Sequence, residues 1–341
     1  MLLGHGNDVH HQLFDIKTDF SSNVLPMGMP EKIKEHIKNN LHLLDNYPLA
    51  DAAKAAKAIA NHHNLDASQI IATNGSTEAF YLIAQKFKQS SSLILTPSFS
   101  EYEDASLSHK LSVSFLPAKK LKTKLNYKYS TVWLANPNNP DGFCFSTSFI
   151  EKLCNKNPDT YFILDESYIN ICSCAQTLIN TYMPNNLIVV RSLTKDFCQP
   201  GLRAGYMVAT SEVIDSINHF RMPWSVNALA QEAIYYIMSN YHSLLPNAAP
   251  ILKESKRVQA ELASLPEIEI TNSDCNYFLA KTKVSSAKEL KTYLLKSHGF
   301  LIRDASNFRS LNKQHFRIAV QNQEANNDLI TAIKTWISQN K

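Results

Sequence analysis

The chain has 341 residues, 44% of them hydrophobic and 19% charged, which is enough apolar material for one large domain and a smaller one. Its net charge of +4 is mild and no dense run of lysine and arginine occurs, so a nucleic-acid partner is not indicated. No apolar stretch approaches membrane-spanning length, and no signal-peptide core begins the chain. We therefore expect a cytoplasmic protein without a membrane partner.

The six cysteines are scattered along the chain, and Cys172-Ser-Cys174 does not have a metal-binding or redox spacing. The twelve histidines also lack a ligand spacing. The sequence therefore predicts reduced thiols and no metal site.

Glycine is scarce, with 8 residues where average usage of about 7% would give roughly 24. A chain this poor in glycine should keep it mainly where backbone geometry requires it. Four of the eight, Gly75, Gly142, Gly201 and Gly205, fall in the candidate site segments described below. This clustering indicates one site built by several segments.

Four short apolar runs alternate with helical patterns and predict strands buried on both faces, hence a largely parallel sheet between helices. The runs are residues 93–95, 132–134, 161–164 and 187–190. A polar cluster follows each run, as is common where a turn ends a strand. Ligand sites in open α/β sheets lie at the carboxyl ends of the strands, so we expect the four clusters to meet in one crevice.

After about residue 228 the pattern changes to helices and strands of an antiparallel type. Helices are expected at 229–240, 248–265 and 327–339, and strands at 268–270, 277–280, 300–303 and 316–320. We predict an amino-terminal arm (1–40) that joins a small α+β domain (229–341), and a large domain between them (41–228).

A phosphate site is predicted where residues 73–78 open a helix. Gly75 would let the backbone approach a ligand, and the N–H groups of Ser76 and Thr77 with the helix dipole suit a phosphate. A plain helix cap explains this segment alone equally well. Arg203 and Ser192 could add a guanidinium fork and a hydroxyl to the same phosphate.

Lys195 follows the buried run 187–190, with Ser192 three residues before it and Arg203 eight after it. Most lysines in such a place are loop lysines, but this one is also well placed to form a Schiff base beside a bound phosphate. Asp165 ends a strand that is apolar on both sides, where a carboxylate needs a cationic partner such as a protonated pyridine nitrogen. Its alternative role is a helix cap.

Three further side chains complete this predicted site. Tyr168 and Asn139 can hydrogen-bond a phenolic oxygen on the ring edge opposite Asp165. Phe99 can stack on the ring face, with Tyr102 as the nearby substitute, although an isolated phenylalanine more often belongs to a core.

The ordered motifs resemble the fold-type I enzymes of the class I/II aminotransferase group, which depend on pyridoxal 5'-phosphate (PLP). They are the segments 75–78, 136–142, 165–168, 192–195 and 200–206. The resemblance implies the fold-type I α/β architecture, with a mostly parallel mixed sheet in the large domain. It implies Lys195 as the Schiff-base lysine and Asp165 as the pyridinium partner. It also implies Arg317 at the substrate carboxylate, and Tyr47 at the PLP phosphate of a neighbouring subunit, hence a homodimer.

Two segments narrow the resemblance within the family. Residues 4–7 with 19–28, which include Asn23, and residues 301–311 are similar to the L-threonine-O-3-phosphate decarboxylases of cobalamin side-chain synthesis. Residues 222–228 are similar to the histidinol-phosphate aminotransferases. Both groups act on small phosphorylated substrates, which implies cationic partners for a second anion. His5 and Arg303 match best, with Arg309 possible. Asn7, Asp141 and Ser167 depart from the usual pattern.

We therefore expect decarboxylation of L-threonine O-3-phosphate to (R)-1-amino-2-propanol O-phosphate. A histidinol-phosphate or related aminotransferase is the alternative, since both reactions need the same catalytic groups and differ in how the substrate is held. A PLP-binding regulator is a third class. Such proteins generally carry an appended DNA-binding module, whereas here the enzyme-like arm starts within the first few residues.

Overall fold

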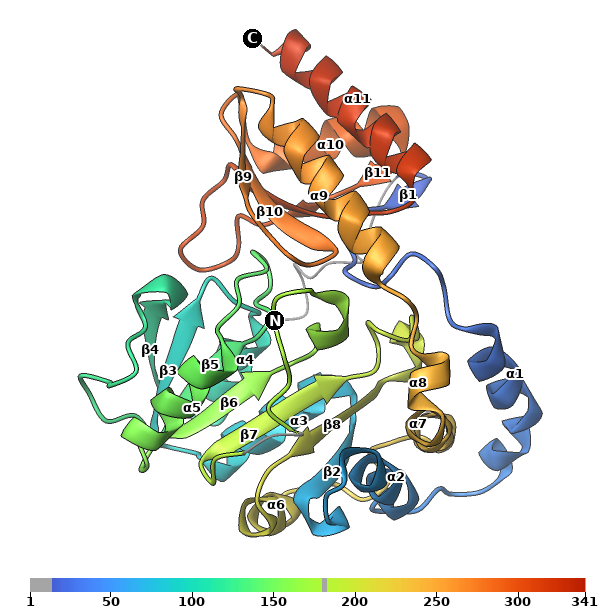
Figure 1. The fold of residues 1–341 in the computed structure, drawn as a ribbon, viewed down its shortest axis with the longest axis vertical. Helices are drawn as coiled ribbons and strands as arrows, with labels where there is room; N and C mark the ends of the chain where they lie inside the picture. The colour runs from blue at the N-terminus through green and yellow to red at the C-terminus, as the bar shows by residue number, and fades with distance from the viewer. Residues whose placement is uncertain (1–13, 180–182, 341) are drawn as a thin grey trace.

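The computed structural model describes residues 14–179 and 183–340. In this part of the chain a seven-stranded sheet lies below a four-stranded sheet, and a third sheet has two short strands (Figure 1). The lower, seven-stranded sheet has the order β2-β8-β7-β6-β5-β3-β4. Its strands are β2 (Ile70–Asn74), β3 (Ser91–Thr96), β4 (Ser112–Pro117), β5 (Thr131–Ala135), β6 (Tyr161–Asp165), β7 (Leu187–Ser192) and β8 (Ala204–Val208). Only β8 runs antiparallel to its neighbours, which confirms the mostly parallel sheet.

The four predicted apolar runs lie in β3, β5, β6 and β7, and the sequence analysis missed β2, β4 and β8. β4 lies at the sheet edge with partly exposed side chains, so it lacks a continuous buried run. β8 begins Ala204-Gly205, and both residues are weak strand formers. These missed strands extend the sheet on both sides of the predicted centre.

Alternate side chains of the central strands pack into two separate cores, as expected for a sheet covered on both faces. Val132 and Leu134 face the core shared with α2 (Ala53–His63), α5 (Thr147–Lys156) and α7 (Ala228–Ser239). Trp133 faces the core shared with α3 (Gly75–Lys86), α4 (Glu101–Ser108) and α6 (Ser211–Asn218). The sheet is thus a rigid support whose strand ends can hold a site.

The upper part contains a four-stranded antiparallel sheet of order β12-β13-β10-β9. Its strands are β9 (Ile268–Thr271), β10 (Tyr277–Thr282), β12 (Arg303–Asp304) and β13 (His315–Ala319), and its helices are α9 (Ala249–Ala263), α10 (Ala287–His298) and α11 (Gln323–Gln339). The predicted strand 300–303 is divided. Its first half, β11 (Phe300–Leu301), pairs in parallel with β1 (Thr18–Asp19), while β12 pairs with β13.

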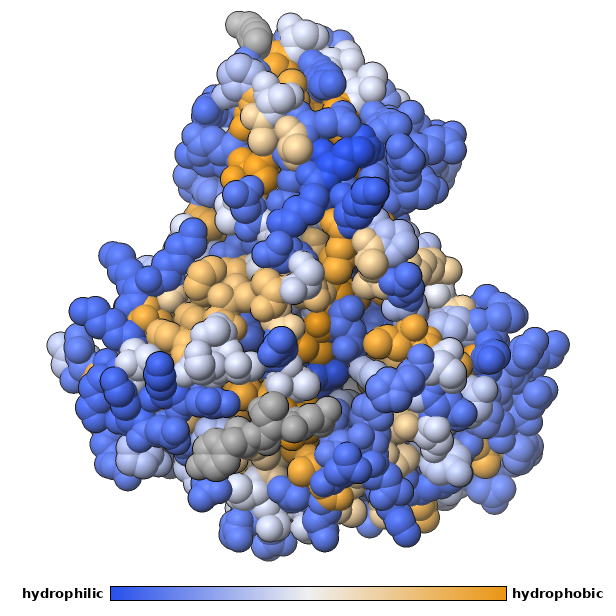
Figure 2. Space-filling view, in the orientation of Figure 1, coloured by the Kyte–Doolittle hydropathy of each residue, from blue (hydrophilic) through white to orange (hydrophobic). Residues whose placement is uncertain are grey.

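The chain passes between the two cores around α1 (Glu31–Asn39) and α8 (Tyr241–Leu244). Apolar residues of α7 and α8 pack in the core of the large sheet. The predicted domain boundaries at residues 40 and 228 stay a prediction. Because α7 and α8 pack in the core of the large sheet, we propose that the small domain begins after α8. The upper part joins the lower at a waist where apolar residues gather among an otherwise hydrophilic surface (Figure 2).

The structure bears on two expectations from the sequence, the lack of a membrane-spanning segment and the reduced state of the cysteines. None of the helices in the described residues is long and apolar enough to cross a bilayer. The expectation of reduced thiols is wrong for Cys144 and Cys174, which form a disulfide. The pair was not visible in the sequence because the two cysteines lie 30 residues apart, in loops that follow the adjacent strands β5 and β6.

Candidate active site

The polar clusters at the strand ends line one cavity of about 330 Å³. This volume lies within the roughly 300–1,000 Å³ of small-molecule sites. Predicted residues that line it are Asn23, Ser76, Thr77, Phe99, Asn139, Asp165, Tyr168, Ser192, Lys195, Arg203 and Arg317. The structure thus brings together side chains from both parts of the molecule, separated by up to about 300 positions in the chain.

The amino terminus of α3 and Arg203 form one end of this cavity. Gly75 has φ +72°, and a Cβ there would lie 2.5 Å from the Arg203 guanidinium. A Cβ on Gly205 would lie 2.7 Å from the Ser76 amide nitrogen. Both glycines are therefore needed for close approach, and helix amides beside a guanidinium form a phosphate site. Gly201 has nothing within 4 Å of such a Cβ, so the geometric requirement expected for it does not hold.

Arg203 itself has a left-handed backbone, with φ +63°. This conformation is unfavourable for a residue with a side chain and persists only where the surroundings enforce it, often at functional sites. Here it accompanies the placement of the guanidinium over Gly75. Its backbone geometry supports the phosphate role predicted for Arg203.

Asp165 is buried at the end of β6, with both carboxylate oxygens hydrogen-bonded. One oxygen accepts from the Tyr102 hydroxyl at 2.5 Å and the other from the Ser167 amide at 2.9 Å. Burial raises the pKa of Asp165, and these hydrogen bonds and the charge of Lys195 oppose the rise. A cation bound beside the carboxylate would offset the cost of burying its charge.

Lys195 lies in the turn after β7, facing the same cavity. Burial, followed by the charges of Arg317 and Arg203, lowers the pKa of its amine from 10.5 to about 8. A larger share of the amine is therefore neutral, and so nucleophilic, near neutral pH than for an ordinary lysine.

Asn139 and Tyr168 line the cavity beside Arg317. Arg317 donates to the Asn139 side-chain oxygen at 2.5 Å and to the carbonyl oxygen of Ser21 in the arm. Its buried Nε has no hydrogen-bond partner among the described residues. A buried donor of this kind needs an acceptor, and a bound carboxylate would supply one. Tyr168 packs edge-on against Tyr277, with ring centroids 5.0 Å apart.

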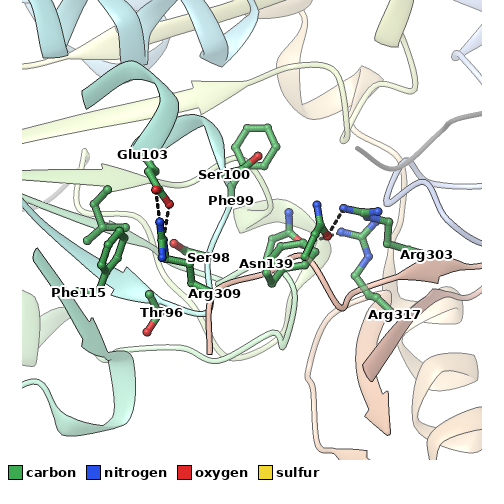
Figure 3. Close-up of a pocket in the computed structure, with 13 residues that line it drawn as sticks. Thr96, Ser98, Phe99, Ser100, Glu103, Phe115, Asn139, Arg303, Arg309 and Arg317 are labelled. Atoms are coloured by element: carbon green, nitrogen blue, oxygen red, sulfur yellow. Dashed lines mark hydrogen bonds and ion pairs between the residues drawn. The ribbon is translucent and has the colours of Figure 1, made fainter. Parts of the chain in front are cut away.

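A second pocket adjoins the first and shares Phe99, Asn139 and Arg317 with it. Arg303 and Arg317 lie together beside Asn139, whereas Arg309 lies at the opposite end, joined to Glu103 (Figure 3). Arg303 donates to the Asn307 side-chain oxygen at 2.8 Å. Of the two arginines, Arg303 is therefore the one that lies beside Arg317, while Arg309 is held by Glu103.

Among the predicted site residues that the structure describes, Tyr47 lies away from the cavity. His5 lies outside the described residues. Tyr47 is 85% exposed and contacts Trp224, with ring centroids 5.4 Å apart, instead of lining the cavity of its own chain. Ser21, Ser22 and Val24 of the arm also line the cavity, a contribution that no motif in the sequence indicates. Tyr102, expected from the sequence only as a stacking residue, donates its hydroxyl to Asp165, a contact that no local pattern indicates.

Comparison with known proteins agrees with this architecture. The chain matches the model of the class I and II aminotransferases over residues 15–333 and belongs to that family. It is 29% identical over 333 residues to the threonine-phosphate decarboxylase of Salmonella typhimurium, covering 94% of this chain and 91% of that protein.

Two solved structures are also similar. The L-threonine-O-3-phosphate decarboxylase from Porphyromonas gingivalis has a TM-score of 0.89 and 35% identity, over 94% of this chain and 99% of that one. The histidinol-phosphate aminotransferase from Clostridium acetobutylicum has a TM-score of 0.85 and 26% identity, also over 94% and 99%. The resemblance and fold class expected from the sequence are confirmed.

PLP is the cofactor of this family, and the cavity fits it. The α3 terminus with Arg203 suits the phosphate, the buried Asp165 suits a protonated pyridine nitrogen, and the Lys195 amine suits covalent attachment. Nothing in the donor set favours a metal at this position.

The lowered pKa of Lys195 predicts how the apoprotein takes up PLP. The neutral amine is the attacking form, so the rate of covalent attachment should rise with pH and level off above about 8. Stopped-flow absorbance of PLP mixed with apoprotein measures this rate. A rate that keeps rising towards pH 10 would show that Lys195 has an ordinary pKa.

Proposed function

We propose that this protein decarboxylates L-threonine O-3-phosphate to (R)-1-amino-2-propanol O-phosphate, a step of cobalamin biosynthesis. The observation that carries the proposal is the pairing of Arg303 and Arg317. These residues lie directly opposite each other in the β12–β13 register, and only 8% and 4% of their surfaces are exposed.

Two guanidinium groups at facing positions of adjacent strands can contact two anionic groups of one small ligand. A substrate with a carboxylate and a phosphate supplies two anionic groups of the planar or forked kind that guanidinium groups bind well. Arg317 lines the cavity with Lys195, while Arg303 lines the adjoining pocket. On this basis we assign the α-carboxylate to Arg317 and the phosphate to Arg303.

Bound PLP supplies an electron sink for the electron pair released when a bond at the substrate Cα breaks. Asp165 would hold the pyridine nitrogen of PLP protonated. Lys195 would attach PLP through its amine and, once free, would return a proton to the substrate Cα after carbon dioxide has left. Asn139 and Tyr168 would hydrogen-bond the ring oxygen, and Phe99 would pack on the ring face. We also assign Asn23 and His5 to substrate binding.

Substitution of Arg303 tests the assignment of the phosphate. Arg303→Gln should lower kcat/KM for L-threonine O-3-phosphate by about 10²–10³-fold, because it leaves a buried anion without its partner. Turnover of L-threonine, which lacks the phosphate, should change little. Arg317→Gln serves as the matched control, since it should lower the turnover of both substrates. Equal losses for both substrates in Arg303→Gln would contradict the assignment.

We further propose a homodimer in which Tyr47 reaches the PLP phosphate of the neighbouring subunit. Exposed apolar side chains occur in the segment of Tyr47 and in that of Trp224, which contacts it, and a patch of this type marks a protein contact surface. They are Leu44, Leu49, Met222 and Trp224. A second copy of the chain would cover this face. The Tyr47 hydroxyl would then lie near the PLP phosphate of that second subunit.

The variant Tyr47→Phe tests this role. Loss of one hydrogen bond to a charged phosphate should weaken PLP binding about tenfold or more while the dimer persists. Fluorescence titration of PLP and sedimentation velocity give the two readouts. Tyr127→Phe, at another exposed tyrosine, should change neither. A monomeric protein with unchanged PLP affinity in Tyr47→Phe would overturn the proposal.

A further inference from the structure

A cluster of cysteines lies outside the PLP cavity, where loops from the two parts of the molecule meet. Cys144 follows β5 and its polar loop, Cys172 and Cys174 follow β6 and Tyr168, and Cys275 precedes β10. The backbones of Cys172 and Cys275 form an antiparallel bridge. The loops after β5 and β6 lie beneath β10 (Figure 1). Three separate stretches of the chain therefore bring sulfur atoms to one place.

Three of these sulfurs form a compact group. The Sγ atoms of Cys144, Cys172 and Cys174 all lie within 4.8 Å of one another. Cys172 Sγ is 3.2 Å from that of Cys174 and 3.6 Å from that of Cys144, and Cys144 and Cys174 are bonded to each other. A disulfide alone uses two cysteines, so it does not account for the third sulfur beside both.

The surroundings suit ligation by thiolates. The amide N–H of Cys174 donates to Cys172 Sγ at 3.4 Å, a bond that stabilises negative charge on the sulfur. Cys174 is exposed and Cys144 and Cys172 are half-buried, which leaves a path from solvent. Asp274, the residue before Cys275, forms an ion pair with Lys256 at 2.7 Å. Its carboxylate is therefore engaged and does not compete with the sulfur atoms as a metal ligand.

We propose that Cys144, Cys172 and Cys174, in their reduced form, bind a thiolate-preferring divalent metal ion of the zinc type. Structural zinc sites use three or four cysteine thiolates in tetrahedral geometry. The half-exposed position of the cluster leaves the fourth coordination position to a water molecule. The disulfide is the oxidised, metal-free form of the same cluster.

The two forms are related by a balanced step. A dithiol reductant gives two electrons and two protons to the Cys144–Cys174 bond and becomes a disulfide itself. The cluster then holds three thiols, and binding of the metal releases their three protons to water. No other reactant is needed.

The bound metal would brace the loops that carry two residues of the PLP site. Asn139 lies in the loop that leads to Cys144, and Tyr168 lies four residues before Cys172. The upper sheet is fastened to the same loops, since the Tyr277 hydroxyl donates to the Asn138 carbonyl oxygen at 2.9 Å. The metal site therefore acts on positioning, at a distance from the reacting atoms.

Cobalt(II) binding to the full-length PLP-loaded protein tests the proposal. The protein is stripped with a chelator, reduced with a phosphine that leaves no competing thiol, and titrated with Co²⁺ under nitrogen. The wild type should bind one equivalent and develop the near-ultraviolet charge-transfer absorption of cobalt thiolates. Cys172→Ser and Cys174→Ser should each weaken binding by at least about tenfold, as loss of a ligand exceeds loss of an outer-shell partner.

Cys154→Ala is the matched control, because Cys154 is a free cysteine buried in α5 away from the cluster, and it should keep full binding. Circular dichroism and PLP absorbance identify variants that fail to fold. In that case a second measurement on the wild type replaces the variant: mass spectrometry of each cysteine after alkylation shows whether Zn²⁺ protects it. Reduced wild type without the thiolate absorption, or Cys172→Ser that binds as well as wild type, would overturn the proposal.

Discussion

Replacement of Lys195 by alanine is expected to lower decarboxylation of L-threonine O-3-phosphate by at least about 10⁴-fold. The variant loses the amine that attaches PLP and the group that returns a proton to Cα, and proton transfer alone contributes about 10²–10⁴-fold. Carbon dioxide release, followed with a coupled assay at saturating PLP, measures the loss.

Borohydride treatment separates this role from a structural one. Reduction should fix PLP covalently to the wild type and not to Lys195→Ala, as seen by mass spectrometry. Lys152→Ala, at an exposed lysine on α5, is the control and should keep both activity and covalent PLP. Covalent PLP in Lys195→Ala would place the attachment at another lysine and remove the basis of the assignment.

The second large effect is expected for Asp165→Asn, which should lower kcat by at least about 10³-fold. The amide has the size of the carboxyl group but carries no charge to keep the pyridine nitrogen protonated, and electrostatic groups of this kind contribute a comparable factor. Since burial raises the pKa of Asp165, its charged form is disfavoured in the apoprotein. The amide keeps one of the two acceptor oxygens, so the variant should still fold, which the thermal midpoint of the apoprotein checks beside the measured kcat.

Tyr102→Phe is the matched control for Asp165. It removes the hydroxyl that donates to the carboxylate and keeps the ring, so a loss of about fivefold is expected, equal to one hydrogen bond of about 1 kcal/mol. If Asp165→Asn lost no more activity than Tyr102→Phe, Asp165 would be a structural acceptor for Tyr102 and not the partner of the ring.

The central strands and the polar groups at their ends were predictable because a short stretch of sequence is enough to determine them. Val132-Trp133-Leu134 is apolar on both faces, and Asp165 directly follows such a run. Gly75 is a similar case, since its left-handed backbone, φ +72°, at the start of a helix favours glycine. Where a residue's environment is set by its own neighbours in sequence, the physical reason was readable.

Contacts between distant segments were not predictable. The bond from Tyr102 to Asp165 spans 63 positions, and that from Arg317 to Ser21 spans 296. Arg303 lies opposite Arg317 because the predicted strand 300–303 is broken into two. Its first half pairs with β1 of the arm, and its second half pairs with β13. The cysteine cluster was likewise hidden, because its members come from loops that only the sheet order brings together.

The most direct measurement is a product balance with L-threonine O-3-phosphate labelled with ¹³C in its carboxyl group. The purified PLP-loaded protein in ²H₂O should release labelled carbon dioxide and 1-amino-2-propanol phosphate in equal amounts, with one deuterium at the carbon that held the carboxylate. Added 2-oxoglutarate should gain no amine from this substrate or from histidinol phosphate. Retention of the label with amine transfer to 2-oxoglutarate would contradict the decarboxylase function and establish an aminotransferase.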